Sequence, residues 1–218
     1  MTTCYKLTTQ DQTTHNDCKW KVDVPKETSG VGELCSPAFL HAYTSPLLAV
    51  LLNPIHAAIE NPKLFLAEGS GVFKSDKGLK VGYSKMTLVE EIVLPVFTTE
   101  QRVAFAILCS LKVYKEQSFV AWAENWLEGS DRSRTTAEAA ARAAARAARA
   151  AARAARAAWT ARAAWAAWAA WAAWAAAEAA AGAAWAAAGA AESAACSAEI
   201  AEIDLDLIAL AEKTARQF

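Results

Sequence analysis

Cysteine and histidine are the residue types in this chain best suited to chemistry. Cys35 and His41 lie six residues apart in the segment LCSPAFLHAY. A thiol next to an imidazole is an activated nucleophile, so this pair is a candidate catalytic site. His15 and His56 are distant in sequence, but a small domain can bring them close to this pair, where the same residue types could bind a metal. Neither set has a diagnostic spacing, and a half-buried structural histidine on a strand is the simpler interpretation of His41.

Sequence motifs for common enzyme chemistries are missing from the chain. It contains no CxxC, no HExxH, no GxSxG and no glycine-rich phosphate loop followed by a helix. The GSG at Gly69–Gly71 is interpreted as turn geometry. The five cysteines are an odd number and no signal peptide precedes them, which predicts a reducing compartment. We therefore expect no cofactor and no metal, and an enzyme is only the third hypothesis for function.

A row of arginines interrupts an alanine-rich tract that runs from about Thr136 to Ser197. From Ala139 to Ala177 there are six arginines and no acid. At about 100° per residue, the four-three-four-three spacing of the first five keeps them on one narrow stripe of a helix. These six candidate partner-binding residues are Arg142, Arg146, Arg149, Arg153, Arg156 and Arg162.

In the second part of the tract the alanines are interrupted mainly by tryptophans. The candidate partner-binding tryptophans are Trp159, Trp165, Trp168, Trp171 and Trp174, and the last four recur at every third residue. On an α-helix each step of three turns back by about 60°, so these indoles form a spiral over about half the circumference. One flat surface cannot cover them all. We therefore expect the helix to be contacted on several sides.

Alanine and arginine have high helix propensity, and no proline occurs after Pro95, so the tract is predicted to be helical over 137–198. A single straight helix of about sixty residues would be on the order of 90 Å long. The alternative is a helical hairpin that folds back near Gly182 or Gly189. Charge favours an antiparallel arrangement, because residues 130–162 carry a net charge of +6 and residues 178–218 carry −5.

Three interpretations of the tract compete. Faces made only of alanine allow close helix-to-helix packing, within the chain or with a partner. The arginine stripe can bind an anionic partner, with tryptophans stacking on bases or lying in a lipid headgroup region. The third interpretation is a simple-sequence expansion without a function of its own. The tract is not expected to span a membrane, because alanine is too weakly apolar and because the charged residues Arg162 and Glu178 would lie in or near the span.

The last segment, 199–218, is predicted to be an amphipathic helix. Ile200, Ile203, Leu207 and Leu210 recur at helical three-four spacing. We expect this helix to dock, either on the N-terminal domain or on a second copy of the chain, because burial of such side chains contributes about 1.5–3 kcal/mol each.

Residues 1–129 are predicted to form a compact α+β domain, followed by a polar joint at 130–136. Strand-like runs are separated by turn residues, and the stretch around SDKG is typical of a β-hairpin. A short buried helix from Pro46 is expected to end at Asn53-Pro54. Two further helices complete the domain: one capped by Thr98 or Thr99, and one that buries Trp122 and Trp126 and stops at Gly129. Thr135 or Thr136 with Glu138 is the expected cap of the alanine helix.

Several motifs of residues 4–133 resemble a family of phage and bacterial proteins of unknown function. They are CYKLTTQDQTTHN, GELCSPAFLHAYTSPLLAVLLNP, LFLAEGSG, KGLKVGYSKMTLVEEIVLP, TTEQRVAFAILCS and WAENWLEGSDRS. Members of this family are similar in carrying a variable alanine-rich C-terminal tail. The resemblance implies a phage or prophage origin, with a location in the cytoplasm of a bacterial host or in the virion. It implies no activity and no site residues.

These observations give an ordered set of hypotheses. The first is a non-enzymatic structural or interaction protein that self-associates or binds another protein through the alanine-rich helix. The second is an anion-binding protein that uses the arginine stripe on nucleic acid or an acidic surface. The third is an enzyme with a site at Cys35 and His41. Interfacial contact with a membrane is the least favoured form of partner binding.

Overall fold

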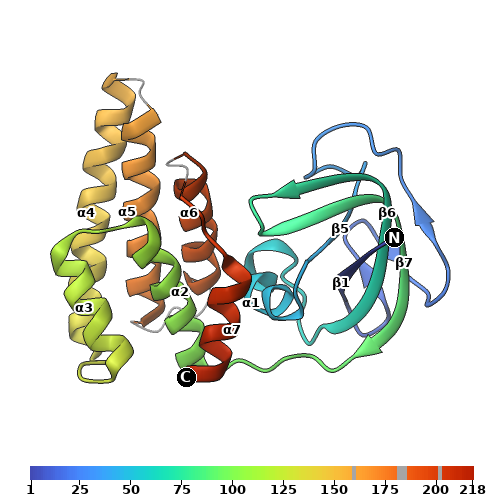
Figure 1. Cartoon of the computed structure of the whole chain (residues 1–218), viewed down its shortest axis with the longest axis horizontal. Coiled ribbons are helices and arrows are strands. Elements are labelled where there is room, and N and C mark those ends of the chain that lie inside the picture. Colours follow the sequence, from blue (N-terminus) through green and yellow to red (C-terminus); the bar gives the residue numbers. More distant parts are fainter. Residues whose placement is uncertain (159–160, 181–185, 201–202) are drawn as a thin grey trace. The chain divides into compact units, whose positions relative to one another are not determined.

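The computed structural model describes residues 1–158, 161–180, 186–200 and 203–218. The chain is an α+β protein, as predicted, and it divides into two compact units, 1–96 and 97–218. The first unit holds the antiparallel sheet, and the second is helical (Figure 1). This division differs from the predicted boundary at residue 129. The helices at 99–113 and 117–128, which were expected to complete the N-terminal domain, belong to the helical unit.

The N-terminal unit is built on an antiparallel sheet with the strand order β1-β6-β7-β4. Its strands are β1 (Thr2–Thr8), β4 (Lys26–Glu27), β6 (Lys63–Asp76) and β7 (Lys80–Ile92), and β5 (Leu40–Ala42) also pairs with β7. A separate small hairpin joins β2 (Thr13–Thr14) to β3 (Cys18–Lys19). Helix α1 (Pro46–His56) lies against β1. The interior of the sheet contains fully buried side chains such as Phe65, Met86 and Leu88.

Strands β6 and β7 form the predicted hairpin, with its turn at Lys77-Gly78. Both turn residues have a positive φ, of 49° and 75°, as the tight turns of hairpins require. The prediction of a turn at Gly69–Gly71 was wrong, because β6 continues through it. Gly71, with a φ of 76°, lies instead in a bulge where the register shifts between Ser70 and Phe73. A bulge needs the same backbone freedom as a turn, so the glycine signal could not distinguish them.

Helix α1 runs through Asn53-Pro54 and ends at His56, which corrects its predicted end. A proline in the last turn removes one helical hydrogen bond and does not stop the residues that follow it. Asn53 closes the helix instead. Its side chain accepts from the Ile59 amide and donates to the Ile59 carbonyl, and its own carbonyl accepts from the Ala57 amide. His56 is thereby held at the end of the helix.

The helical unit contains α2 (Thr99–Val113), α3 (Gln117–Glu128), α4 (Arg134–Ala158), α5 (Ala161–Ala180), α6 (Ala186–Ile200) and α7 (Leu207–Gln217). The first two have the predicted boundaries. Thr98 and Gln101 form a reciprocal capping box at the start of α2, and Gly129, with a φ of 81°, ends α3. Trp122 and Trp126 on α3 are buried, as predicted.

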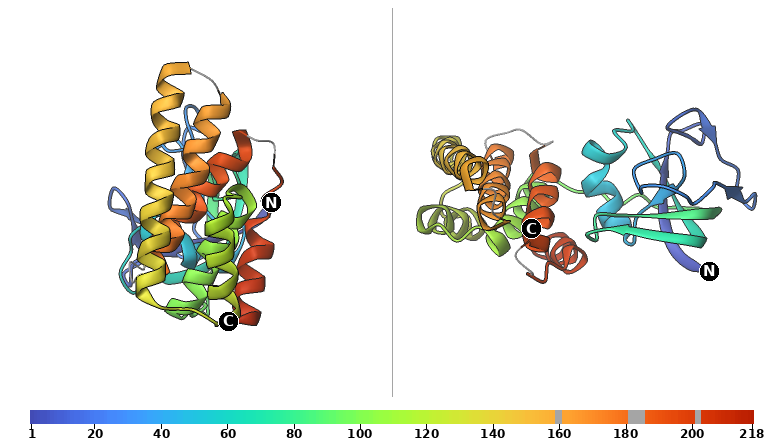
Figure 2. Two further views of the ribbon diagram at one scale, coloured as in Figure 1. Left: turned by 90° about the vertical axis from the view of Figure 1, so that its left-hand side faces the viewer. Right: turned by 90° about the horizontal axis from the view of Figure 1, so that it is seen from above.

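The alanine-rich tract forms three helices of ordinary length, so the single long helix was not observed. Helices α4 and α5 run side by side in opposite directions, as the alternative of a hairpin predicts (Figures 1 and 2). Helix α5 also packs against α6 and α2, which confirms that it is contacted on several sides. Gly189 lies inside α6 and not at a turn. Gly182 falls outside the described residues.

Alanine side chains form much of the interior of this unit. Ala137, Ala141 and Ala144 of α4 share one cluster with Ala173 and Ala176 of α5, and all five are at most 2% exposed. A methyl side chain lets two helix axes approach closely, so backbone atoms contribute to the dispersion attraction. The Ser110 hydroxyl of α2, fully buried, lies 2.8 Å from the Ala172 carbonyl of α5 and donates to it. Close packing thus replaces large apolar side chains.

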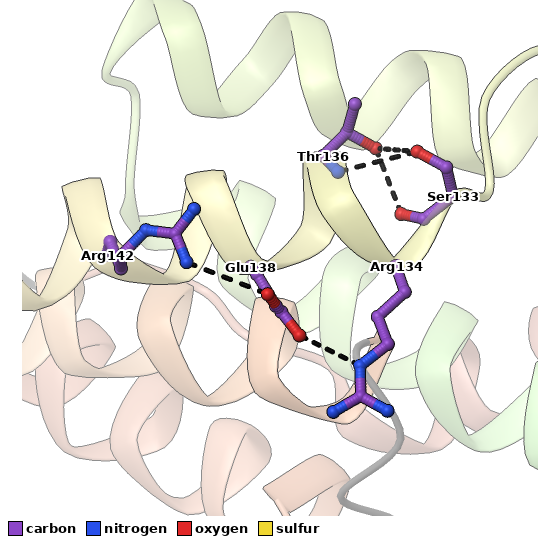
Figure 3. A network of polar contacts seen from close by, with 5 residues as sticks. All are labelled: Ser133, Arg134, Thr136, Glu138 and Arg142. Atoms are coloured by element: carbon purple, nitrogen blue, oxygen red, sulfur yellow. Dashed lines mark hydrogen bonds and ion pairs between the residues drawn. The ribbon is translucent and has the colours of Figure 1, made fainter.

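The polar joint predicted at 130–136 is shorter than expected: it connects α3 to α4 within the helical unit, and α4 already begins at Arg134. Arg132 stacks on Trp126, 4.8 Å from its ring centroid, and forms an ion pair with Glu100 of α2. The cap of α4 is Ser133, which corrects the prediction of Thr135 or Thr136. The Ser133 hydroxyl accepts from the Thr136 amide, and its carbonyl accepts from the Ala137 amide (Figure 3).

The C-terminal helix is shorter than predicted and begins at Leu207, where Asp206 caps it. Leu207, Leu210 and Ala211 are buried, and the helix docks on α2. Ile203 precedes the helix and is half-buried, and the side chain of Ile200 lies outside the described residues. The expectation that this segment docks is confirmed, with α2 of the helical unit as its partner.

The alanine interior predicts a strong asymmetry between buried and exposed alanines. Ala176→Leu, at a fully buried position of α5, should lower the free energy of unfolding by about 1–3 kcal/mol, because the added atoms force α5 away from its neighbours. Ala150→Leu, at an exposed position of α4, is the matched control and should change it by less than about 0.5 kcal/mol. Urea unfolding measures both. Equal stability of the two variants would contradict close packing at Ala176.

Candidate functional site

The predicted arginine stripe is a solvent-exposed face of α4. Arg142, Arg146, Arg149 and Arg153 are all exposed. Ala144 and Ala148, which lie on another face of the same helix, are buried. The side chains of Arg156 and Arg162 lie outside the described residues. We call the four exposed residues the arginine face.

Only the first member of the arginine face has an acidic partner among the described residues. Glu138 accepts from Arg134 at 2.8 Å and lies 3.6 Å from Arg142 (Figure 3). The hydrogen bond from Arg134 lowers the pKa of Glu138, and the charge of Arg142 acts in the same direction. No described carboxylate is within ion-pair distance of Arg146, Arg149 or Arg153. The basic character of this face is therefore not neutralised within the described chain.

The tryptophans of α5 lie at the edges of its helix contacts. Trp165, Trp171 and Trp174 are half-buried, and Trp168 is 42% exposed. The alanines between them fill the tight contacts, which leave no room for indoles. Trp168, Trp171 and Trp174 line a groove of about 460 Å³ with Gly189 and Glu192 of α6. Trp159 lies outside the described residues.

A larger cavity, of about 1130 Å³, lies in the N-terminal unit. It is lined by all three histidines of the chain, His15, His41 and His56, and by Cys35. These residues come from the loop before β3, from β5 and from the end of α1. The structure thus brings together the residues that sequence spacing left apart. We call this space the histidine cavity.

His41 has the predicted position on a strand, β5, and is half-buried. Its Nε2 is hydrogen-bonded to the Leu34 carbonyl, so this nitrogen is the donor. Burial lowers the pKa of His41, which favours the neutral ring. Cys35 is exposed and its thiol makes no hydrogen bond to His41. The two candidate catalytic residues share a cavity, but the structure shows no contact that would activate the thiol.

His56 is stacked on Tyr43, with ring centroids 6.0 Å apart and planes inclined by 15°. Neither of its ring nitrogens is accessible to solvent or has a hydrogen-bond partner. Burial is the main reason that its pKa falls to about 4, and the charge of Lys80 adds to the effect. At neutral pH the ring is uncharged and presents one donor and one acceptor.

Lys6 of β1 also lines the cavity, and sequence analysis did not identify it. It is only 8% exposed. Its Nζ donates to the His41 carbonyl at 2.6 Å and lies 5.1 Å from the centroid of the Trp20 ring. Burial lowers the pKa of Lys6 from 10.5 to about 8. The only sequence signal for its burial was the alternation of β1, which puts Lys6 on the same face as Cys4 and Thr8. This signal is weak, because a single lysine in a strand is usually solvated.

The described residues contain no group of three histidine, cysteine or acidic side chains placed to hold a metal ion. They also contain no helix with the length and apolar character needed to cross a membrane.

Comparisons with known proteins gave no match to a family model, to a curated protein or to a solved structure. The resemblance of residues 4–133 to a phage and bacterial family therefore stays a prediction.

The lowered pKa of His56 predicts a loss of stability in acid. Between pH 6.5 and about 4 the unfolded chain binds a proton at His56 that the folded chain does not, so stability falls as pH falls through this window. His56→Phe keeps a ring against Tyr43 and removes the titrating group, so its midpoint temperature should fall less on acidification. His15→Gln, at an exposed histidine of the same cavity, is the control and should follow the wild type. Parallel pH curves for wild type and His56→Phe would contradict the assignment.

The burial of Lys6 predicts a loss of stability that is present at neutral pH and relieved at alkaline pH. Its folded-state pKa of about 8 lies below 10.5, so its unfavourable burial is fully present below about pH 8 and is relieved as pH rises to 10.5. Lys6→Met should therefore raise the free energy of unfolding at neutral pH, by up to about 3 kcal/mol, with little gain in strong alkali. Lys63→Met, outside the cavity, is the control. A Lys6→Met variant less stable than wild type at neutral pH would show that the folded protein favours the ammonium.

Proposed function

We propose that this chain is a non-enzymatic interaction protein whose helical unit holds the arginine face toward a polyanionic partner, with the backbone of a nucleic acid as the chemistry that fits best. The observation that carries the proposal is the exposure of four arginines on one side of α4, while Ala137, Ala141, Ala144 and Ala148 of the same helix are buried. A phage or prophage origin, and a location in the cytoplasm of a host or in a virion, are further parts of the proposal that rest on sequence resemblance.

The packing of the tract favours the arginine face over the alanine surface as the site of interaction. The leading expectation from sequence was self-association through the alanine-rich helix. The alanines of α4, α5 and α6 are, however, largely used in contacts with one another and with α2. A second copy could reach them only by opening these contacts. An oligomer would have to use other residues, such as the groove beside Trp168.

The identity of the basic residue also supports a phosphate partner. Arginine presents a planar fork of donors that matches phosphate oxygens in a bidentate manner, whereas lysine acts as a point charge. The tract from Arg134 to Ile200 contains no lysine. From Arg142 to Arg153 the face extends over about 16 Å along the helix, at about 1.5 Å per residue, so it can follow several phosphates.

Removal of the arginine face should weaken nucleic acid binding and its dependence on salt. In the tested variant Arg142, Arg146, Arg149 and Arg153 are changed to glutamine, which keeps helix propensity. Each phosphate contact contributes about 0.9 to the slope of log affinity against log salt on duplex DNA, so the loss of four contacts should lower the slope by about three to four. Fluorescence anisotropy with labelled duplex DNA and single-stranded RNA over a range of salt concentrations measures both affinity and slope.

The control removes the same charge from other parts of the helical unit. Lys112, Lys115, Lys213 and Arg216 are exposed and are changed together to glutamine. This variant should bind nearly as the wild type does. Equal losses in both variants would indicate a nonspecific effect of net charge and would contradict the proposal. So would a wild type that binds neither nucleic acid at low salt.

A further inference from the structure

The histidine cavity has the wall of a ligand site and is slightly larger than most such sites. Small-molecule sites usually occupy about 300–1,000 Å³ and combine apolar walls with a few convergent polar groups. This cavity, of about 1130 Å³, is lined by the aromatic side chains Trp20, Phe39 and Tyr43 together with Lys6 and His56. The three aromatic side chains are at most 6% exposed, so their positions are set by packing.

The first indication of a ligand is a buried cation without a counter-charge. The ammonium of Lys6 has a carbonyl and the face of Trp20 as neighbours, and no carboxylate of the described residues forms an ion pair with it. A buried charge is costly unless an opposite charge accompanies it. The acids that line the cavity, Asp17 and Glu60, are exposed. An anionic group bound at Lys6 would supply the missing charge.

The second indication is a pair of unused hydrogen-bonding atoms. The ring nitrogens of His56 are inaccessible and without partners, although the ring lines the cavity. Most buried polar groups in proteins have a partner, and each exception calls for an explanation, such as a catalytic role or a bound water or ion. This observation is independent of Lys6, because it concerns an uncharged ring on another element.

From these two groups in one aromatic-walled space we propose that the histidine cavity binds a small molecule that carries an anionic phosphate or carboxylate group on a planar ring. Lys6 holds the anionic group, and the aromatic wall, to which the stacked rings of Tyr43 and His56 belong, holds the planar ring. This site is separate from the arginine face. It makes the N-terminal unit a small-molecule-binding module.

All three histidines of the chain line the cavity, so their NMR signals report on it selectively. The experiment uses the full chain with ¹³C-labelled histidine and titrates adenosine monophosphate, 4-hydroxybenzoate, and adenosine as the uncharged control. At least one of the two anions should move the His41 and His56 ring signals to saturation, with at least about tenfold higher affinity than adenosine, or about 1.4 kcal/mol. The two anions distinguish phosphate from carboxylate as the anionic group.

Two variants connect binding to the proposed residues. Lys6→Met should weaken binding of the anion at least tenfold, about 1.4 kcal/mol, and leave the affinity for adenosine unchanged. Lys63→Met, which removes a lysine paired with Glu91 outside the cavity, should bind as the wild type does.

Three results would overturn the proposal: no saturable shift with either anion, an affinity for adenosine as high as that for either anion, or full binding of the anion by Lys6→Met. The first two use only the wild-type chain, so they hold even if the variant fails to fold. None of these results involves the arginine face, so the failure of one proposal is distinguishable from the failure of the other.

Discussion

The close approach of helices through alanine methyl groups is the interaction on which the helical unit depends. Each alanine buries little apolar area, so stability has to come from many short contacts between backbones. Helix α5 shows the consequence, because it packs on α4, α6 and α2 at once. Such contacts leave no room for larger side chains. The indoles of α5 lie at the edges, where Trp168 is 42% exposed, and the arginines of α4 lie on the side turned to solvent.

Buried polar groups occur in both units. In the helical unit the arginine face is exposed, and the buried Ser110 hydroxyl has its partner on a neighbouring helix, whereas the buried indole nitrogens of Trp122 and Trp165 have none. In the N-terminal unit the sheet keeps Lys6 and His56 away from solvent with their polar atoms incompletely paired. Buried groups of this kind lower stability, and each calls for a structural or functional reason. The candidate small-molecule site lies in the first unit and the candidate polyanion surface in the second.

Local signals in the sequence predicted local structure well. The cap at Thr98, the end of α3 at Gly129, the β6–β7 turn and the exposed stripe of arginines all follow from the spacing of a few neighbouring residues. Long-range features were not predictable in the same way. Helix α2 has apolar residues on nearly all sides. This pattern indicates that the helix is buried but does not identify the elements that cover it, so α2 was assigned to the wrong unit. An alanine-rich face does not determine which helix it packs against, because all its methyl side chains are alike. The gathering of the three histidines around Lys6 depends on tertiary contacts between β1, β5 and α1, which spacing along the chain does not reveal.

The return of the alanine-rich tract on itself is the central claim, because it buries the alanines and turns the arginine face outward. Pulsed electron paramagnetic resonance can measure the distance between spin labels carried by unnatural amino acids at Arg134 and Glu178, in the full chain. Packed helix axes lie about 8–10 Å apart, so with the arms of the labels the distance should be on the order of 20 Å. A continuous helix would separate the two positions by about 65 Å at 1.5 Å per residue. A distribution centred near that longer distance would contradict the fold and remove the basis for the arginine face.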